Sequence, residues 1–229
     1  HLSADLIYGL PDRKVPFSED LQKACDLPVD HLSAYILTVE DKTVLGRNVQ
    51  KGIDRVAPDS LVESEYSELC ARATQAGFEH YEVSNFARPG GRAQHNQHYW
   101  TGLPYLGIGP GAHGFDGKRR SANASNNPAY IAQISKAKKL TEIQADFESL
   151  TERDRYNEHL MTGLRTANGI DIAELTRKFG HNPIAEDPQF WKQCLDDCTI
   201  VALSDDNYRI REDKWLIADR ISSAFFAVD

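Results

Sequence analysis

The chain has 229 residues, a formal net charge of −8 and 41% hydrophobic residues, which is the composition of an ordinary globular protein. The acidic balance argues against a broad nucleic-acid-binding surface, because such a surface needs a basic face. Apolar runs stay well short of the roughly 20 residues that a membrane-spanning helix needs, and the N-terminus lacks the pattern of a secretory signal.

The first third of the chain predicts alternating strands and helices. Residues 4–11 favour a strand and a turn, residues 18–27 a helix, and residues 31–40 a second strand. This order forms a βαβ unit with parallel strands and a right-handed crossover. A helix over 58–77 and a strand over 78–87 extend the pattern to a parallel or mixed sheet.

Asp5 interrupts the otherwise apolar first strand. Because side chains alternate along a strand, Asp5, Ile7 and Gly9 are expected to share one face. Buried carboxylates need partners, and an inward Asp in a parallel sheet often contacts a ligand, so a ligand role and a structural role for Asp5 both stay open. Glu82, Ser84 and Asn85 add a polar patch at a strand end, where α/β proteins bind ligands.

The stretch HNQHYW, residues 95–100, concentrates polar aromatic side chains in a predicted loop flanked by glycines. Imidazole is a common ligand of transition metals, including heme iron. Tyrosine and tryptophan rings can stack on a large planar ligand, and an asparagine can orient a histidine. Composition alone leaves two interpretations: a ligand site, or a surface loop that Trp100 anchors in the core.

A glycine-rich stretch, YLGIGPGAHG, follows at residues 105–114. Its glycines let the backbone approach a ligand closely, although tight turns explain them equally well. No Lys-Ser/Thr pair follows, so the spacing does not match a phosphate-binding loop. His113 is a second candidate metal ligand, and Lys118, Arg119 and Arg120 either meet an anionic ligand such as a propionate or form a solvated loop.

The last third of the chain predicts helix, helix, hairpin and helix, an order that resembles a winged-helix module. Ser149 with Glu152, and Asp171 with Glu174, match the capping pattern of helix N-termini. Residues 151–229 carry 15 acidic and 10 basic residues, a net charge of −5. Since phosphate contacts need the opposite sign, we expect a packing or lid module rather than DNA binding.

Four cysteines, Cys25, Cys70, Cys194 and Cys198, are spread along the chain. Cys194 and Cys198 would share a helix face, but a metal site usually needs more thiolates or a nearby histidine. We therefore expect four reduced, structural cysteines and a cytoplasmic location. Met161 is the only methionine, so His1 is not a translation start, and the chain is expected to be trimmed or a fragment.

Five segments occur in the order found in radical S-adenosylmethionine (SAM) proteins related to oxygen-independent coproporphyrinogen III oxidase: DLIYGLP, HLSAYILTVE, HYEVSNFARPG, HNQHYW and YLGIGPGAHG. The resemblance covers residues 4–128 well and the remainder loosely. HNQHYW is similar to the His-Asn-x-x-Tyr-Trp heme-binding motif of HemW-type heme chaperones, a motif that the oxidases lack. The chain therefore resembles the HemW type more than the oxidase.

The resemblance implies an α/β fold in two parts. Residues 1–128 would form the C-terminal portion of a partial (β/α)6 radical SAM barrel, with the heme motif in a loop. Residues 129–229 would form a mainly helical, winged-helix-like domain. The cofactors implied are heme, S-adenosylmethionine and a [4Fe-4S] cluster, the last two in the full-length parent.

The resemblance also implies site residues. Asp5, Tyr35 and Leu37 would line the S-adenosylmethionine cavity. At the motif, His95 would be the leading heme contact and the candidate iron ligand, supported by Asn96, Tyr99 and Trp100. His98 falls on a variable position of the motif.

One departure limits the resemblance. The family holds its cluster with a Cys-x-x-x-Cys-x-x-Cys motif near the N-terminus, and this motif and the glycine-rich motif after it are absent here. The chain is therefore expected to begin inside the barrel. Because three thiolates hold the cluster, the chain by itself is expected to be catalytically inactive.

The primary hypothesis is a HemW-like chaperone that binds heme and passes it to an acceptor protein. The alternative is an oxygen-independent coproporphyrinogen III oxidase, whose full-length form decarboxylates porphyrinogen propionates by means of a 5′-deoxyadenosyl radical. A third hypothesis makes residues 151–229 a docking module for the heme acceptor.

Overall fold

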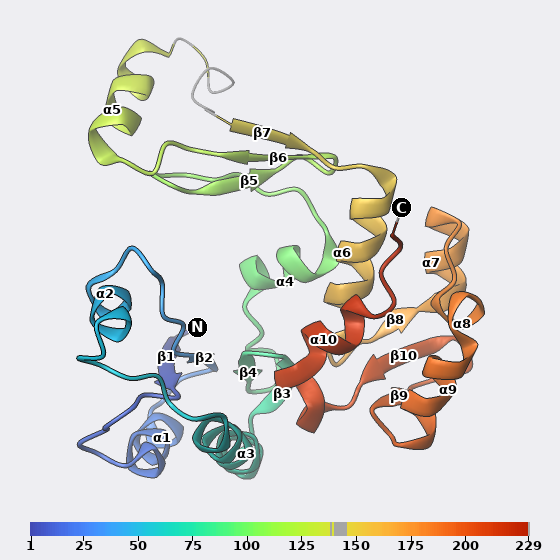
Figure 1. Ribbon diagram of the computed structural model, residues 1–229, viewed down its shortest axis with the longest axis horizontal. Coiled ribbons are helices and arrows are strands. Elements are labelled where there is room, and N and C mark those ends of the chain that lie inside the picture. Colours follow the sequence, from blue (N-terminus) through green and yellow to red (C-terminus); the bar gives the residue numbers. More distant parts are fainter. Residues whose placement is uncertain (138, 140–145, 229) are drawn as a thin grey trace. The chain divides into compact units, whose positions relative to one another are not determined.

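The computed structural model describes residues 1–137, 139 and 146–228 (Figure 1). Within them the chain forms two compact units. Unit 1 comprises His1–Ala93, Arg165–Asn168 and Ile210–Ala218, and unit 2 comprises Gln94–Leu164, Gly169–Arg209 and Asp219–Asp229. Two short late segments thus belong to the N-terminal unit, so both units are discontinuous in sequence.

Unit 1 is built on a mixed sheet. Its strands are β1 (Ser3–Tyr8), β2 (His31–Ile36), β3 (Glu79–Glu82) and β4 (Asn85–Ala87), in the order β1-β2-β4-β3. β1 and β2 are parallel and are joined through helix α1 (Phe17–Asp26), whereas β4 runs antiparallel to both β2 and β3. The βαβ unit and the mixed sheet expected from the sequence are confirmed.

Helices α1 and α3 (Asp59–Gln75) contact each other in unit 1, and the short α2 (Val44–Gln50) begins at the Thr43 cap. The predicted helix over 58–77 is confirmed as α3. Leu21 from α1 and Leu69 from α3 are fully buried, as is Leu32 of β2. Each such side chain stabilises the fold by about 1.5–3 kcal/mol through removal from water, so the periodic apolar residues hold the helices to the sheet.

A late segment completes the core of unit 1. The 3-10 helix η2 (Glu212–Ile217) places Trp215 edge-on against the His80 ring, with centroids 4.4 Å apart, and His80 stacks on Phe86 at 4.0 Å. The Trp215 Nε1 donates to the Ile210 carbonyl at 2.9 Å. The predicted single last helix is therefore wrong in detail: it is divided into η2 and α10 (Ala218–Ser223).

Unit 2 contains two three-stranded sheets among its described residues. One is antiparallel, with the order β5 (His113–Phe115), β6 (Arg119–Ala122) and β7 (Asp146–Ser149). The other has the order β8 (Ile170–Asp171), β10 (Asn207–Ile210) and β9 (Ile200–Ala202). β9 and β10 are neighbours in this sheet and form the hairpin that the sequence predicts in the last third of the chain.

Besides most of α10, the described helices of unit 2 are α4 (Gln94–Thr101), α5 (Asn127–Lys136), α6 (Glu152–Leu164), α7 (Ile172–Phe179), α8 (Pro183–Glu186) and α9 (Pro188–Asp196). The sequence NPAYIAQISKAKKL predicts a helix over residues 127–140, and the last part of that range lies partly outside the described residues. The Asp171 cap of α7 is confirmed by its bond from the Glu174 N–H at 2.7 Å. The cap predicted at Ser149 is wrong, because Thr151 caps α6 and exchanges hydrogen bonds with Asp154.

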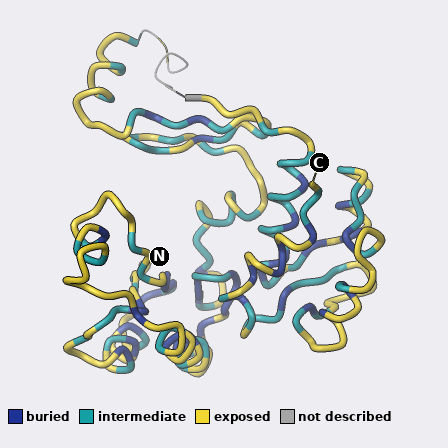
Figure 2. Tube along the Cα trace, in the orientation of Figure 1, coloured by how far each residue is buried: buried dark blue, intermediate teal, exposed yellow. Residues whose placement is uncertain are grey.

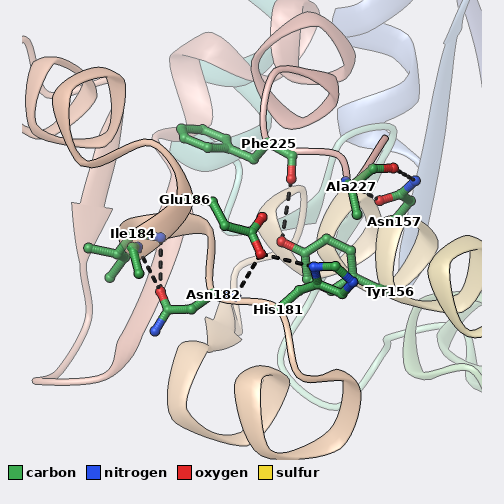
Figure 3. A network of polar contacts seen from close by, with 9 residues as sticks. Tyr156, Asn157, His181, Asn182, Ile184, Glu186, Phe225 and Ala227 are labelled. Atoms are coloured by element: carbon green, nitrogen blue, oxygen red, sulfur yellow. Dashed lines mark hydrogen bonds and ion pairs between the residues drawn. The ribbon is translucent and has the colours of Figure 1, made fainter. Parts of the chain in front are cut away.

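Helix α6 also anchors the last residues of the chain (Figure 3). The Asn157 amide donates to the Ala227 carbonyl at 3.1 Å and accepts from the Ala227 N–H at 2.8 Å. The Tyr156 hydroxyl donates to the Phe225 carbonyl at 3.3 Å. These contacts fix the terminal segment against α6 within unit 2. Among the described helices, none is both long and apolar enough to cross a membrane.

Candidate functional site

The HNQHYW stretch is helical, so the expectation of a loop is wrong. It forms most of α4, which has no Gly or Pro inside it. The helix ends at Gly102, whose φ of 66° is left-handed, and the Leu103 N–H returns to the His98 carbonyl at 3.2 Å. None of the α4 residues is buried (Figure 2). The interpretation that Trp100 anchors a loop in the core therefore fails.

An aromatic row runs from α4 to β5. The His95 ring meets Tyr99 one turn later, with a 2.9 Å hydrogen bond between His95 Nε2 and the Tyr99 hydroxyl. Tyr99 packs edge-on against Tyr105 at 4.6 Å, and Tyr105 lies 6.1 Å from Phe115. Burial raises the pKa of Tyr105, and Tyr99 raises it further. Such pairs contribute about 0.5–1.5 kcal/mol each, so the row holds α4 to the sheet.

A cavity of about 370 Å³, here named the α4–α6 pocket, opens beside this row within unit 2. Its volume falls in the range of roughly 300–1,000 Å³ that is usual for ligand sites. Its aromatic wall consists of Tyr99, Tyr105, Phe115 and Phe179. Its polar and sulfur-bearing wall consists of His98, Arg120, Arg155, Glu158, His159, Met161, Thr162 and Lys178.

The charged side chains of the pocket are predominantly cationic. Arg120, Arg155 and Lys178 face a single lining carboxylate, Glu158, which pairs with Arg120 at 2.7 Å. Burial raises the pKa of Glu158, while Arg120 opposes the shift. The Arg155 Nε is buried and donates no hydrogen bond to any described residue. The pocket therefore favours an anionic ligand.

Three pocket side chains can donate electrons to a metal: His98, His159 and Met161. Burial lowers the pKa of His159, and Lys178 lowers it further, so this imidazole is neutral and keeps a free lone pair at pH 7. A flat ligand carrying both a metal and negative charges would suit the donors, the rings and the cations together.

Only part of the predicted heme motif lines this pocket. His98 and Tyr99 do, whereas His95 is exposed and Asn96 and Trp100 are half-buried elsewhere on α4. His113 is exposed on β5 and is not in the lining. The remaining wall residues on α6 and α7 were missed, although the spacing of residues 155, 158, 159 and 162 along one helix face was a signal for them.

The sequence offers Lys118, Arg119 and Arg120 as neighbouring cations for an anionic ligand. Arg120 alone of the three lines the α4–α6 pocket. Arg119 pairs with Asp116 at 3.0 Å, and the Lys118 N–H is bonded to the same carboxylate. Arg119 and Arg120 are adjacent in β6, so their side chains point to opposite faces of the sheet.

In unit 1, the register pairs Asp5 with Ser33 and Ile7 with Tyr35. Asp5 is exposed and so is not the buried carboxylate that the strand suggested. Ile7 is 48% exposed and Tyr35 is 45% exposed, and they share the Asp5 face. The Leu37 N–H continues the ladder to the Tyr8 carbonyl at 2.9 Å. This face offers a carboxylate beside an aromatic ring and apolar surface.

Glu82 and Asn85 belong to the core of unit 1 instead of an open ligand site. Glu82 is fully buried, accepts a bond from the Ser84 N–H at 3.2 Å and accepts another from the Asn85 amide. Burial raises the Glu82 pKa to about 7, and the bonds from Ser84 and Asn85 oppose the shift. The Glu82 carboxylate of the predicted patch is thus satisfied by its neighbours, whereas the Asn85 Oδ1 is buried without a hydrogen bond to the described residues.

The residues that the structure describes do not fit an iron–sulfur cluster. They include no group of three or more His, Cys, Asp or Glu side chains placed to hold a metal ion. Cys25 and Cys70 are half-buried in unit 1, whereas Cys194 is buried and Cys198 exposed in unit 2.

Comparisons with known proteins found a family model, curated relatives and a solved structure to which this chain is similar. A family model described as HemN C-terminal domain matches residues 150–189, the segment that carries most of the α6 and α7 walls of the pocket. The heme chaperone HemW of Mycobacterium tuberculosis H37Rv is 37% identical over 179 residues, which are 76% of this chain and 44% of that protein. HemW of Bacillus subtilis 168 is 32% identical over 80% of this chain and 48% of that protein.

Two further matches concern the radical SAM relationship. A mouse protein named radical S-adenosyl methionine domain-containing protein 1, mitochondrial, is 48% identical over 117 residues, 49% of this chain and 26% of that protein. The solved structure of coproporphyrinogen III oxidase (HemN) from Escherichia coli, a radical SAM enzyme, superposes with a TM-score of 0.72 at 18% identity. It covers 98% of this chain and 54% of HemN, so the expected fold class is confirmed. The chain spans about half the length of these HemW relatives and of HemN.

Proposed function

Because the chain belongs to the HemW/HemN-like radical SAM proteins, we propose that it is the heme-binding part of a HemW-like heme chaperone that passes heme to an acceptor protein. One observation supports the proposal most directly. The helix that carries HNQHYW borders a pocket with aromatic walls, metal-donor side chains and an excess of cations. These are the chemical features that an iron tetrapyrrole with two carboxylates requires.

Within this proposal, His95 is the leading iron ligand, and Asn96, Tyr99 and Trp100 support the macrocycle. His95 is exposed and can approach a ligand from solvent. Its Nε2 currently bonds the Tyr99 hydroxyl, so coordination through that nitrogen would replace the hydrogen bond. His98 becomes a stronger candidate than the motif suggested, because it faces the pocket.

S-adenosylmethionine and a [4Fe-4S] cluster belong to the longer protein in this proposal. Asp5, Tyr35 and Leu37 would contact S-adenosylmethionine, and their fit rests on the exposed carboxylate and ring of one strand face. S-adenosylmethionine would supply radical chemistry when bound beside a cluster. The division into a barrel portion (residues 1–128) and a C-terminal domain (residues 129–229), and a cytoplasmic location, are further parts of the proposal.

Absorbance titration with hemin tests heme binding. We expect a shifted Soret band with the wild-type chain and its loss in the double variant His95→Ala/His98→Ala. His113→Ala is a matched control, because this exposed histidine of the same unit lies outside the pocket. A Soret shift that survives the double replacement would remove the motif from the explanation.

The second candidate function is oxidation of coproporphyrinogen III by the longer protein. The fold shared with HemN supports it, as do pocket cations suited to propionates. The HemW relatives, at 30–37% identity, favour the chaperone. An assay of the full-length protein loaded with its cluster separates the two, since clear conversion to protoporphyrinogen would favour the oxidase.

A further inference from the structure

Three cationic side chains line the α4–α6 pocket, and none of them belongs to the HNQHYW stretch. Resting on the proposed heme function, we propose that Arg120, Arg155 and Lys178 form a carboxylate-binding site that holds the propionates of the tetrapyrrole. The site makes the chain selective for dianionic macrocycles. Its residues come from β6, α6 and α7, none of which includes the HNQHYW stretch.

Cations converge on the pocket of an otherwise acidic chain. The whole chain has a net charge of −8, yet the pocket lining contains three cations and one carboxylate. With the histidines neutral, the lining has a net charge of +2. Concentrating like charges costs free energy unless an anion compensates them. A ligand with two carboxylates would neutralise the pocket.

The three cations of the pocket keep hydrogen-bond donors that an anion can use. Among the residues that the structure describes, the Arg155 guanidinium pairs with Glu152 at 3.5 Å, and its buried Nε makes no hydrogen bond. Lys178 lies over the Phe179 ring at 5.0 Å, which leaves its ammonium donors available for an anion. Arg120 is paired with Glu158 at 2.7 Å. An incoming carboxylate would share Arg120 with Glu158, whose own ionised form is disfavoured by burial.

Aromatic rings line the same cavity as the cations. Tyr99, Tyr105, Phe115 and Phe179 supply aromatic faces on the same cavity as the three cations. Flat apolar ligands stack on such rings, while guanidinium groups bind carboxylates with two parallel hydrogen bonds. The combination therefore selects a flat, apolar body with acidic substituents over a simple anion.

Hemin and hemin dimethyl ester, in which both carboxylates are blocked, test the assignment on the full chain. We expect the wild type to bind hemin at least about tenfold more tightly than the ester, because a hydrogen bond to a charged group is worth roughly that factor or more. Arg155→Met and Arg120→Met should weaken hemin binding about tenfold and leave ester binding unchanged. Arg155→Lys should keep part of the preference.

Arg177→Met is the matched control, since Arg177 neighbours Lys178, is 77% exposed and lies outside the lining. Metal-free protoporphyrin IX, followed by fluorescence, adds a readout that does not depend on iron ligands. Its binding should survive His95→Ala/His98→Ala and be lost in Arg120→Met/Arg155→Met. Circular dichroism melts verify that each variant is folded.

The outcomes separate the two proposals. If hemin binds the wild type but the ester binds equally well, or if Arg177→Met has the same effect as Arg155→Met, the carboxylate site is overturned while heme binding stands. If neither hemin nor protoporphyrin binds the folded wild-type chain, the proposed function is overturned together with the carboxylate site.

Discussion

His95 and Tyr99 lie one turn apart on α4 and are joined by a 2.9 Å hydrogen bond between the imidazole Nε2 and the phenol hydroxyl. In the proposed heme complex, coordination of iron through this nitrogen would replace the bond. A neutral hydrogen bond of this kind contributes about 0.5–1.5 kcal/mol, so its loss on ligand binding reduces the affinity by a few-fold to about tenfold.

Removing the Tyr99 hydroxyl and removing the whole Tyr99 ring should therefore change hemin affinity in opposite directions. Tyr99→Phe keeps the ring against Tyr105 and frees His95, so hemin affinity should rise severalfold in an absorbance titration. Tyr99→Ala removes a pocket wall and should weaken binding. Equal losses in both variants would show instead that the hydroxyl itself contacts the ligand.

Because Asn157 anchors the C-terminal segment, replacing it should lower the stability of the fold substantially. Its amide makes two hydrogen bonds to the Ala227 backbone (Figure 3). Asn157→Ala should lower the free energy of unfolding by about 1–3 kcal/mol, because two partly buried backbone groups lose their partner. Urea unfolding monitors the change. Gln189→Ala, an exposed position on α9, should have little effect, and equal midpoints for the two variants would contradict the anchoring role.

Buried Glu82 predicts a pH dependence of stability. Burial raises its pKa from 4.5 in the unfolded chain to about 7 in the fold. The folded state therefore binds a proton that the unfolded state releases, and stability falls as pH rises from about 4.5 to 7 and then levels off. The difference of about 2.5 pKa units corresponds to roughly 3 kcal/mol.

Glu82→Gln should remove this dependence. We expect the difference in unfolding free energy between pH 5 and pH 8 to shrink in the variant, as measured by urea titration at both values. Glu79→Gln on the same strand is the control, since the Glu79 side chain is 58% exposed. Parallel pH profiles for wild type and Glu82→Gln would exclude Glu82 as the titrating group.

Alanine substitutions at Gly52 and Gly169 distinguish the energetic cost of backbone strain from the cost of a steric clash. Gly52 and Gly169 have the same φ of 70°. A Cβ on Gly52 meets nothing within 4 Å, whereas one on Gly169 would lie 2.6 Å from the Tyr208 carbonyl oxygen. Gly52→Ala should cost about 1–2 kcal/mol for the left-handed backbone alone. Gly169→Ala should cost clearly more in the same thermal melts, and similar losses would mean that the Gly169 turn relaxes freely.

Much of unit 1 could be predicted from the sequence. The βαβ unit and α3 follow from apolar periodicity, since Leu69 and its neighbours face the core at helical spacing. Helix α4 could not be predicted in this way. It buries no side chain and lacks an apolar stripe, and its contact with α6 and the aromatic row through Tyr99 help to hold it.

By itself the sequence determined the family, the α/β class and the HNQHYW stretch, because these depend on residues that are neighbours along the chain. Tertiary structure decided which side chains face a common cavity. Arg120, Arg155 and Lys178 belong to β6, α6 and α7, and nothing in their local sequence marks them as partners. Their meeting depends on how a strand and two helices pack, and packing follows from the whole buried core of unit 2.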